Sequence, residues 1–501
     1  MADTLRPYQV SAVADLVHAI DAGERRIILV APTASGKTII ACELIRVLAD
    51  RFPSALVLSH RLEIITQTSK KLYACGIAHG IIKAGYTPHP AERVQVASVQ
   101  TLWTRAVRSK IMALPPAELI LIDEAHHTPA RTYQKLIEAY PDAIVIGLTA
   151  TPCRGDGRGL GSIYKLMVEC PQVPDLIKQG YLVRSRVYAP VTPNLKGVKV
   201  RAGDYVEEQL AGRMDDAKLI GDIVTHWHKF GERRRTIAFA VNVSHSRHLA
   251  DEFAKSGVKV EHLDGTTPEP ERNAMLARLA SGETEVITNC MVLTEGFDLP
   301  DIGCITLARP TKKMGLFRQM IGRGLRTADG KKDCIILDHS GAVFEHGLPE
   351  DRVVWPLAPD KRATSPTHAA RGNGRSKAKL TTCAQCCAIR LPGEPCQNCG
   401  YMPKPPARAV PVREGELGLV SNGRARATPN DPETRRRWHA MFKHIAAERG
   451  YKPGWVAHKY REKFGAFPNW HADPPPIPPS PEVRSWVRSR AIAYAKSARS
   501  E

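Results

Sequence analysis

The sequence predicts an α/β fold with two tandem parallel-sheet domains, a small metal ribbon and a basic, mainly helical C-terminal region. Two series of short runs rich in branched apolar residues, separated by helix-length segments, are typical of buried parallel strands. Two Cys-x-x-Cys motifs follow the second series, and most of the positive charge lies near the end of the chain. These observations divide the 501 residues into a two-domain front and a tail.

The first series of apolar runs predicts a domain over residues 1–185, and the second series predicts another over 186–355. The strands expected in the first domain are 27–30, 55–58, 94–97, 119–122 and 143–148. The strands expected in the second domain are 236–240, 258–260, 286–288, 304–307 and 334–337.

The remaining 146 residues are predicted to alternate between linkers and small folded segments. Residues 356–380 and 403–432 lack a sustained apolar period and are rich in Ala, Pro, Gly and basic residues, which favours flexible linkers. They flank a ribbon at 381–402 and precede a basic, aromatic-rich helical region at 433–501.

The segment Ala-Pro-Thr-Ala-Ser-Gly-Lys-Thr, residues 31–38, stands between the first expected strand and a helical pattern. Gly36 permits a tight backbone path on which N–H groups and a helix N-terminus converge on phosphate oxygens. Lys37 adds a point charge, and Thr38 adds a hydroxyl for Mg²⁺. A nucleoside triphosphate site is therefore predicted, with Thr33 and Ser35 as further ligands. Only the Gly-Lys-Thr half of the usual pattern matches, so a turn opening an ordinary helix is the alternative.

Asp123-Glu-Ala-His126 stands at the end of another expected strand. Ligands of open α/β sheets bind at the carboxyl ends of strands, so these carboxylates face the same edge as the phosphate loop. We expect Asp123 to hold Mg²⁺ and Glu124 to orient or deprotonate an attacking water. In the second domain, Arg323 and Arg326 share one helix face and can reach a γ-phosphate across a cleft as arginine fingers.

In their order along the chain, these segments resemble the motifs of superfamily 2 helicases and translocases. The resemblance covers roughly the first 340 residues and implies two RecA-like domains that hydrolyse ATP. The matching segments are Tyr8-Gln9 (Q motif), 31–38 (motif I), 59–62 (Ia), 98–101 (Ib), 123–126 (II), 148–152 (III), 294–298 (V) and 319–326 (VI).

The resemblance also implies roles for individual residues. Gln9, beside Tyr8, would read adenine and so select ATP. Thr149 and Thr151 would couple the ATP site to the strand-binding face. The remaining implied roles are a link between nucleotide and nucleic acid for Gly296 and Asp298, and an interdomain relay for His126 and Gln319. His127 stays unassigned.

Asp-Glu-Ala-His together with Leu-Thr-Ala-Thr-Pro is unlike the DEAD-box RNA helicases and more similar to DNA-acting members, namely restriction subunits and RadD-like repair proteins. This implies an ATP-dependent DNA helicase or translocase in repair, recombination or replication. The segment between Asp298 and Gln319 has little room for a strand-separating hairpin, so translocation or strand remodelling is as plausible as processive unwinding. The alternatives are an ATP-switched nucleic-acid-binding scaffold, the motor subunit of a restriction system, and an RNA helicase.

Twelve cysteines indicate reduced thiols plus one metal site, because seven are scattered singly and five crowd between 383 and 399. Cys383, Cys386, Cys396 and Cys399 form two knuckles that suit structural Zn²⁺. Cys387 is surplus and can replace Cys386. Free cysteines are the alternative.

Positive charge is concentrated in the tail. Residues 361–501 hold 26 Lys and Arg against 10 Asp and Glu, a net of +16 out of +20. This asymmetry predicts a polyanionic partner, nucleic acid rather than a membrane, with a solubilising tail as the alternative. Together with the resemblance, it implies DNA (duplex, fork or single strand) as the partner, with single-strand-binding or repair proteins as further candidates. Trp438, Trp455, Trp470 and Trp486 lie among these basic residues and either stack bases or build a small core.

No apolar run approaches the eighteen or more residues of a membrane span, and the first residues lack the apolar core of a signal peptide. We therefore expect no membrane partner and a cytoplasmic location, associated with the nucleoid in a bacterium or phage-infected cell.

Overall fold

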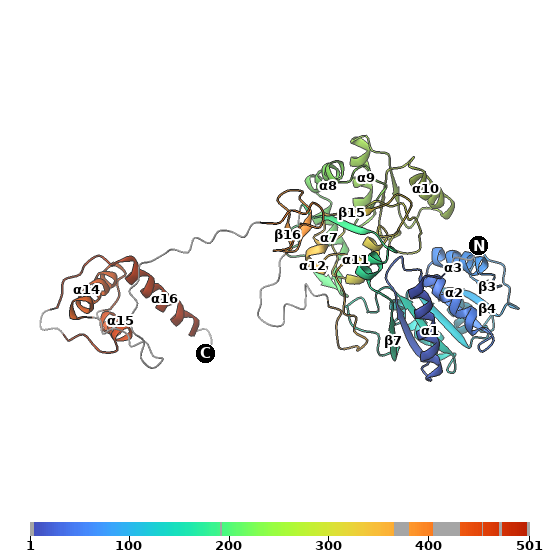
Figure 1. Ribbon diagram of the computed structural model, residues 1–501, viewed down its shortest axis with the longest axis horizontal. Helices are drawn as coiled ribbons and strands as arrows, with labels where there is room; N and C mark the ends of the chain where they lie inside the picture. Colours follow the sequence, from blue (N-terminus) through green and yellow to red (C-terminus); the bar gives the residue numbers. More distant parts are fainter. Residues whose placement is uncertain are drawn as a thin grey trace. The chain divides into compact units, whose positions relative to one another are not determined.

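The computed structural model describes residues 5–190, 193–364, 380–403, 431–452, 454–469 and 473–497. The chain divides into two compact units, Met1–Pro406 and Ala407–Glu501. Among the described residues, the larger unit holds two parallel sheets and the cysteine ribbon, and the smaller unit holds α-helices (Figure 1). No helix among the described residues is long and apolar enough to cross a bilayer.

The first domain is built on a seven-stranded parallel sheet of order β3-β4-β2-β5-β6-β1-β7. Its strands are β1 (Arg26–Val30), β2 (Ala55–Ser59), β3 (Gly80–Ile82), β4 (Val94–Ser98), β5 (Leu119–Asp123), β6 (Ile144–Thr149) and β7 (Leu166–Glu169). The five predicted strands are present. Strands β3 and β7 were not predicted, because both are short edge strands and neither carries a long buried apolar run.

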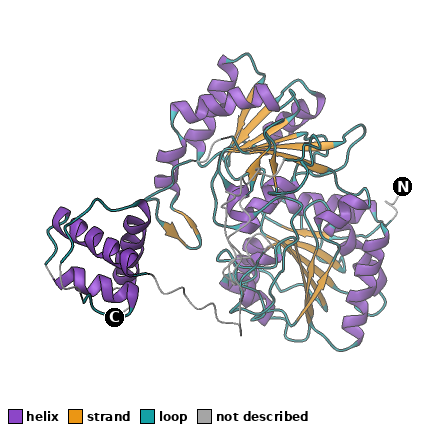
Figure 2. Ribbon diagram, turned by 60° about the vertical axis from the view of Figure 1, so that its left-hand side comes forward, coloured by secondary structure: helices purple, strands orange, loops and turns teal. Residues whose placement is uncertain are grey.

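Helices cover both faces of this sheet (Figure 2). They are α1 (Pro7–Asp21), α2 (Lys37–Leu48), α3 (Leu62–Ala74), α4 (Val99–Leu102), η1 (Trp103–Arg108), η2 (Ala125–His127), α5 (Arg131–Glu138) and α6 (Val173–Lys178).

The second domain is built on a six-stranded parallel sheet of order β12-β13-β11-β14-β15-β8. Its strands are β8 (Arg184–Tyr188), β11 (Thr236–Phe239), β12 (Val260–Leu263), β13 (Val286–Asn289), β14 (Cys304–Leu307) and β15 (Asp333–Asp338). The edge strand β8 was not predicted, because its sequence Arg-Ser-Arg-Val-Tyr is largely polar, and it begins before the expected boundary at 185/186. β12 lies two residues later than predicted.

The other elements of the second domain are six helices and a short hairpin. They are α7 (Glu207–Met214), α8 (Ala217–Phe230), α9 (Val243–Lys255), α10 (Glu269–Ser281), α11 (Met314–Gly322), α12 (Ala342–His346), β9 (Val200–Arg201) and β10 (Asp204–Tyr205).

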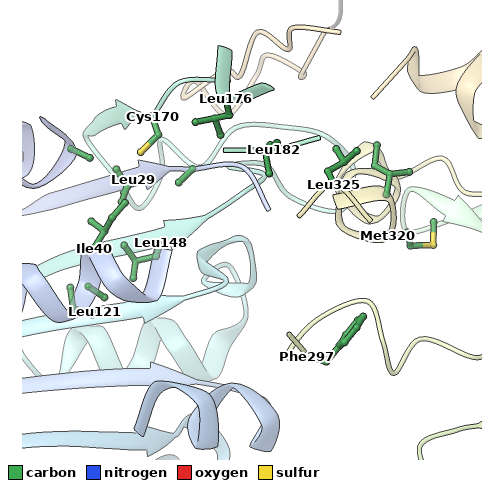
Figure 3. Packing of buried hydrophobic residues seen from close by; sticks show 14 of the residues in the cluster. Leu29, Ile40, Leu121, Leu148, Cys170, Leu176, Leu182, Phe297, Met320 and Leu325 are labelled. Carbon is green, nitrogen blue, oxygen red and sulfur yellow. The ribbon is translucent and has the colours of Figure 1, made fainter. Parts of the chain in front are cut away.

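One apolar cluster extends from the first sheet into the second domain (Figure 3). Leu29 and Leu148 belong to the first sheet, Leu182 lies in the crossing segment, and Leu325 follows α11. The N–H of Val183 also donates to the carbonyl of Leu325 at 2.9 Å. The crossing between the domains is therefore packed, which positions α11 against the first sheet.

Residues 356–364 pack on the first domain, which corrects the prediction of a linker beginning at 356. Leu357 packs against a buried cluster of the first domain. The N–H groups of Gly159 and Gly161 donate to the carbonyls of Lys361 and Leu357, at 3.2 and 2.6 Å. Backbone pairing with a glycine-rich loop needs no apolar periodicity, so the sequence pattern did not reveal it. Residues 365–379 and 404–430 of the predicted linkers lie outside the described residues.

The ribbon carries strands β16 (Thr381–Thr382) and β17 (Ile389–Arg390) and packs on the second domain. Cys383 and Cys396 belong to the same buried cluster as Tyr188 and Trp227. The ribbon is therefore part of the larger unit.

The helices of the smaller unit that the structure describes are α14 (Pro432–Glu448), α15 (Gly454–Phe464) and α16 (Pro481–Ser497). Trp438 is buried in its apolar cluster, against which Trp455 and Trp486 pack half-buried. Of the two interpretations of these tryptophans, the structure supports core formation. Trp470 lies outside the described residues.

Candidate nucleotide site and interdomain cleft

The phosphate loop joins β1 to α2 through two residues in the left-handed region. Ala34 has φ +73° and Gly36 has φ +81°, and α2 begins directly afterwards at Lys37. The positive φ of Gly36 favours glycine, and a Cβ there would also lie 2.5 Å from the Gln9 amide nitrogen, which would have to move. The N-terminus of α2 has no side-chain cap and is open to an anion.

Tyr8 and Gln9 form hydrogen bonds with the backbone of the phosphate loop. The Tyr8 hydroxyl and the Gln9 amide both donate to the carbonyl of Ser35, at 2.6 and 2.9 Å. The N–H of Arg6 donates to the Gln9 side-chain oxygen at 2.9 Å. The predicted adenine-reading pair thus lies beside the phosphate loop and contacts it directly.

A cavity of about 390 Å³ opens in front of the loop and is lined by both domains. This volume is in the range of small-ligand sites. Its polar lining includes Arg6, Gln9, Thr33, Lys37, Thr38, Asp123, Glu124, Gly296, Asp298, Arg323 and Arg326. Most of the site residues predicted from the sequence therefore meet in one place, and the open helix end beside two carboxylates fits a triphosphate with Mg²⁺.

The two carboxylates of motif II differ in environment. Asp123 ends β5, and burial together with the neighbouring Glu124 raises its pKa to about 6. Burial alone would raise the pKa of Glu124, but Lys37 and His126 outweigh it and lower that pKa. Glu124 also adopts φ +51°, a strained conformation for a side chain of this type. The Glu124 carboxyl is therefore kept ionised, and its backbone has a conformation that glutamate rarely adopts.

His126 lies between the two domains. Its Nδ1 is 3.3 Å from Glu124 Oε2 and 3.2 Å from Thr149 Oγ1, and its Nε2 is 3.7 Å from Glu295 Oε1. Burial disfavours the charged ring, but the two carboxylates outweigh burial and raise the pKa of His126 to about 9.

The predicted arginine fingers enter the cavity from the end of α11. Arg323 donates to the carbonyls of Thr294 and Phe297 at 2.7 to 3.1 Å, and Arg326 pairs with Asp298 at 3.1 Å. Burial lowers the pKa of Arg323 to about 9, so it stays charged at neutral pH.

Helix α11 lies directly against the first domain. A Cβ on Gly322 would lie 2.5 Å from the Thr33 side chain, and one on Gly315 would lie 3.2 Å from Thr151 Oγ1. Two small residues of α11 therefore allow close contact with the phosphate loop and with motif III.

Sequence reasoning missed Glu295, the partner of Gln319. The Gln319 amide donates to Glu295 Oε1 at 3.1 Å, and Arg61 Nε lies 3.0 Å from Glu295 Oε2. In the sequence this residue lies within the segment 294–298 that resembles motif V, where roles were predicted for Gly296 and Asp298 but not for Glu295. Only its burial between the domains distinguishes it.

The four predicted zinc ligands lie together. The sulfur of Cys383 is 3.7 Å from that of Cys399, and the sulfur of Cys386 is 3.6 Å from that of Cys396. Tetrahedral Zn²⁺ with bonds of about 2.3 Å separates its sulfurs by about 3.8 Å, so the set fits that ion. Cys387 is exposed and does not belong to the cluster.

Comparisons with known families match both sheet domains. Residues 3–154 match the family described as type III restriction enzyme, res subunit, and residues 218–328 match the helicase conserved C-terminal domain. A 51.5 kDa protein of Lactococcus phage (isolate 7-9) is 31% identical over 65% of this chain and 68% of that protein. The putative ATP-dependent helicase IRC3 of Saccharomyces cerevisiae is 33% identical over 68% of this chain and 52% of its own length, so the chain spans about half of that relative.

Solved structures share the fold. A fragment of a putative HsdR subunit of a type I restriction enzyme from Vibrio vulnificus superposes with a TM-score of 0.54 and 23% identity, covering 71% of this chain and 67% of that one. The type ISP restriction-modification enzyme LlaBIII bound to DNA gives a TM-score of 0.53 and 18% identity, over 67% of this chain and 28% of that enzyme.

Proposed function

Because the chain belongs to the superfamily 2 helicases and restriction-subunit motors, and is an ATP-hydrolysing member, we propose that it converts ATP hydrolysis into movement along DNA. The observation that carries this proposal is the two-sided lining of the nucleotide cavity. The first domain supplies Lys37 and Glu124, and the second supplies Gly296, Arg323 and Arg326. A change at the γ-phosphate therefore alters the contact between the two domains.

The residues of the cavity divide the chemistry of hydrolysis among them. Lys37 and the N–H groups of the phosphate loop hold the phosphates. Thr38 and Asp123 would hold Mg²⁺, which would supply positive charge against the phosphate oxygens. Glu124 orients the attacking water. Arg323 and Arg326 stabilise the charge that builds on the γ-phosphate in the transition state.

A second cleft, of about 980 Å³, fits a nucleic-acid strand. It also draws its lining from both domains, and it shares no lining residue with the nucleotide cavity. Its charged lining comprises six basic residues, Arg61, Arg154, Arg309, Lys312, Lys313 and Arg362, and four acidic ones, Asp156, Asp204, Glu295 and Glu345. Positive groups on both domains suit a phosphate backbone that spans them.

The C-terminal unit supports retention on DNA. Its described residues hold 13 Lys and Arg against 6 Asp and Glu, counted over 431–497. Exposed members of this set include Arg436, Arg437, Arg449, Arg461 and Arg488. Because Trp438, Trp455 and Trp486 belong to the apolar cluster, we assign this interaction to phosphate contacts rather than to base stacking by these three residues.

The ribbon takes Zn²⁺ as a structural ion. Four sulfurs leave no open position for water, so the metal contributes to folding rather than to catalysis.

The deciding measurement is the ATPase rate against a panel of DNA and RNA duplexes, forks and single strands. DNA should stimulate turnover, and displacement of a third strand from a triplex should report movement. Stimulation by RNA without DNA would instead favour an RNA helicase. Slow hydrolysis without displacement would favour an ATP-switched scaffold.

We also propose a role in DNA repair, recombination or replication, with single-strand-binding or repair proteins as partners at the nucleoid. This role is tested separately from the motor activity. Disruption of the gene should sensitise cells to DNA damage, and an unchanged sensitivity would argue for a restriction-linked role.

A further inference from the structure

The carboxylate of Glu295 lies at the interface between the two sheet domains. It lies in the loop between β13 and β14 and is 5% exposed. Among the described residues, four of its partners come from the first domain. They are Arg61 Nε at 3.0 Å, His60 Nε2 at 3.3 Å, His126 Nε2 at 3.7 Å and His127 Nε2 at 3.8 Å.

These partners keep Glu295 ionised. Burial would raise the pKa of this carboxyl, but His126, His127, His60 and Arg61 outweigh burial and hold the pKa far below its usual range. Removing one partner from a buried ion pair leaves an uncompensated charge, so the closed interface depends on these contacts.

The same cluster does not suit a metal ion. His60, His127 and Glu295 place three ligand atoms within 4.8 Å of one another. However, Arg61 and the protonated ring of His126 already face this carboxylate, and they would repel a further cation. The cluster is therefore an ion-pair network.

Within this network, His126 differs from the other histidines because it also reaches the catalytic carboxylate. Its Nε2 faces Glu295, and its Nδ1 lies 3.3 Å from Glu124 Oε2. Glu124 Oε2 is buried, and no side chain donates a hydrogen bond of good geometry to it among the described residues. One imidazole thus joins a carboxylate of the second domain to the carboxylate that orients water.

We propose that Glu295 is a positioning residue for ATP hydrolysis, which holds the His126 ring from the second domain and thereby fixes the Glu124 carboxylate toward the attacking water. When the domains separate, Glu295 leaves with the second domain and His126 loses this support. Efficient hydrolysis is then confined to the closed interface without any contact between Glu295 and the nucleotide. Glu295 does not line the nucleotide cavity, which agrees with an indirect role.

The first experiment removes the charge of Glu295 but keeps the shape of its side chain. In Glu295→Gln, kcat for ATP should fall about 10-fold or more, while KM for ATP should change less than about 2-fold, because water orientation matters in the transition state and the cavity lining is intact. An unchanged kcat would overturn the proposal, and so would a loss confined to KM.

A double-mutant cycle tests whether Glu295 acts through His126. We expect His126→Ala combined with Glu295→Gln to be no slower, within about 2-fold, than the slower single variant. If the two losses multiply, Glu295 acts independently of His126 and the proposal fails.

His127 provides the matched control, because its ring faces the same carboxylate at 3.8 Å, while its link to Glu124 is a backbone hydrogen bond at 3.0 Å that an alanine would keep. His127→Ala should lower kcat less than about 2-fold, whereas His126→Ala should lower it about 10-fold or more. Equal losses would mean that the cluster only holds the domains together, which contradicts the proposal. This comparison decides the question even if Glu295→Gln does not fold.

Discussion

The two sheet domains share a strand-loop-helix unit but use its helix N-terminus differently. In the first domain, β1 leads through Gly36 to an uncapped α2, which faces the nucleotide cavity. In the second domain, β11 leads to Asn242, whose side chain accepts a hydrogen bond from the N–H of His245 at 2.8 Å and caps α9. The second domain thus satisfies within its own chain the N–H group that the first leaves free for phosphate. The first domain therefore presents an uncapped helix end to the cavity, whereas the second contributes Arg323 and Arg326 to its lining.

The largest expected effect comes from substitutions in the nucleotide cavity, beside the uncapped N-terminus of α2. Lys37→Ala and Glu124→Gln should each lower ATP turnover by at least about 100-fold, the first by weakening phosphate binding and the second with ATP binding retained. The equivalent change in the second domain, Asn242→Ala, should cost about 1 kcal/mol of stability and leave turnover within about 2-fold. Steady-state hydrolysis, equilibrium ATP binding and thermal unfolding measure these effects. Normal turnover in Lys37→Ala would refute the site assignment.

The second prediction concerns what the second domain adds. Arg323→Ala or Arg326→Ala should lower kcat by about 10- to 1000-fold and change ATP affinity much less, because charge builds on the γ-phosphate only in the transition state. Arg233→Ala, at an exposed arginine elsewhere in the same domain, serves as the control. Equal losses in kcat and affinity would indicate ground-state binding alone.

The third prediction compares the cysteine ribbon with the C-terminal helical unit. Because the ribbon shares a buried cluster with Trp227, Cys396→Ser with Cys399→Ser should destabilise the second domain by about 2–4 kcal/mol and release the metal. Trp438→Ala should destabilise only the helical unit and leave ATP turnover without DNA unchanged. Calorimetry with separate transitions measures both. A ribbon that unfolds while the second domain keeps its unfolding temperature would contradict the shared core.

The tail itself is tested by ending the chain after Pro406, because the contact boundary between the two units falls there. Loss of its basic residues should weaken DNA binding and flatten the dependence of affinity on salt concentration, since fewer counterions are released. ATP hydrolysis without DNA should persist. Unchanged affinity and slope would show that the tail's charge is solubilising surface.

The smallest predicted effect separates two buried histidines. The pKa of His126 is raised to about 9 by its carboxylates, so the stability it contributes is present below pH 6.5 and is lost as pH rises to 9. Burial lowers the pKa of His245 to about 4, so it destabilises the second domain as pH falls from 6.5 to 4. Each effect is about 1–3 kcal/mol. We expect the free energy of unfolding, measured between pH 4 and 9, to fall less with rising pH above 6.5 in His126→Ala than in the unmodified protein. An unchanged fall would contradict the ion pairs of His126.

Much of the candidate site could be predicted because its residues are tied to strand ends. Gly36, Lys37 and Asp123 follow or end buried parallel strands, and such ends share one edge of the sheet. The spacing of Arg323 and Arg326 places them on one helix face and suggests arginine fingers, but it does not indicate which cleft they face. Their placement in the nucleotide cavity came from the packing of α11.

The sequence by itself determined the elements whose signal is local: the buried central strands, the phosphate loop and the paired cysteines. Those signals are local because backbone conformation and ligand spacing act over a few residues. Only the tertiary structure decided that Glu295 is buried between the domains, that residues 356–364 pair with the Gly159 loop, and that the ribbon packs on the second sheet. Each of these features depends on contacts between segments far apart in the chain. Such contacts change the cost of burying a charge or satisfy a backbone hydrogen-bonding group. A short sequence pattern does not indicate which distant segment makes the contact.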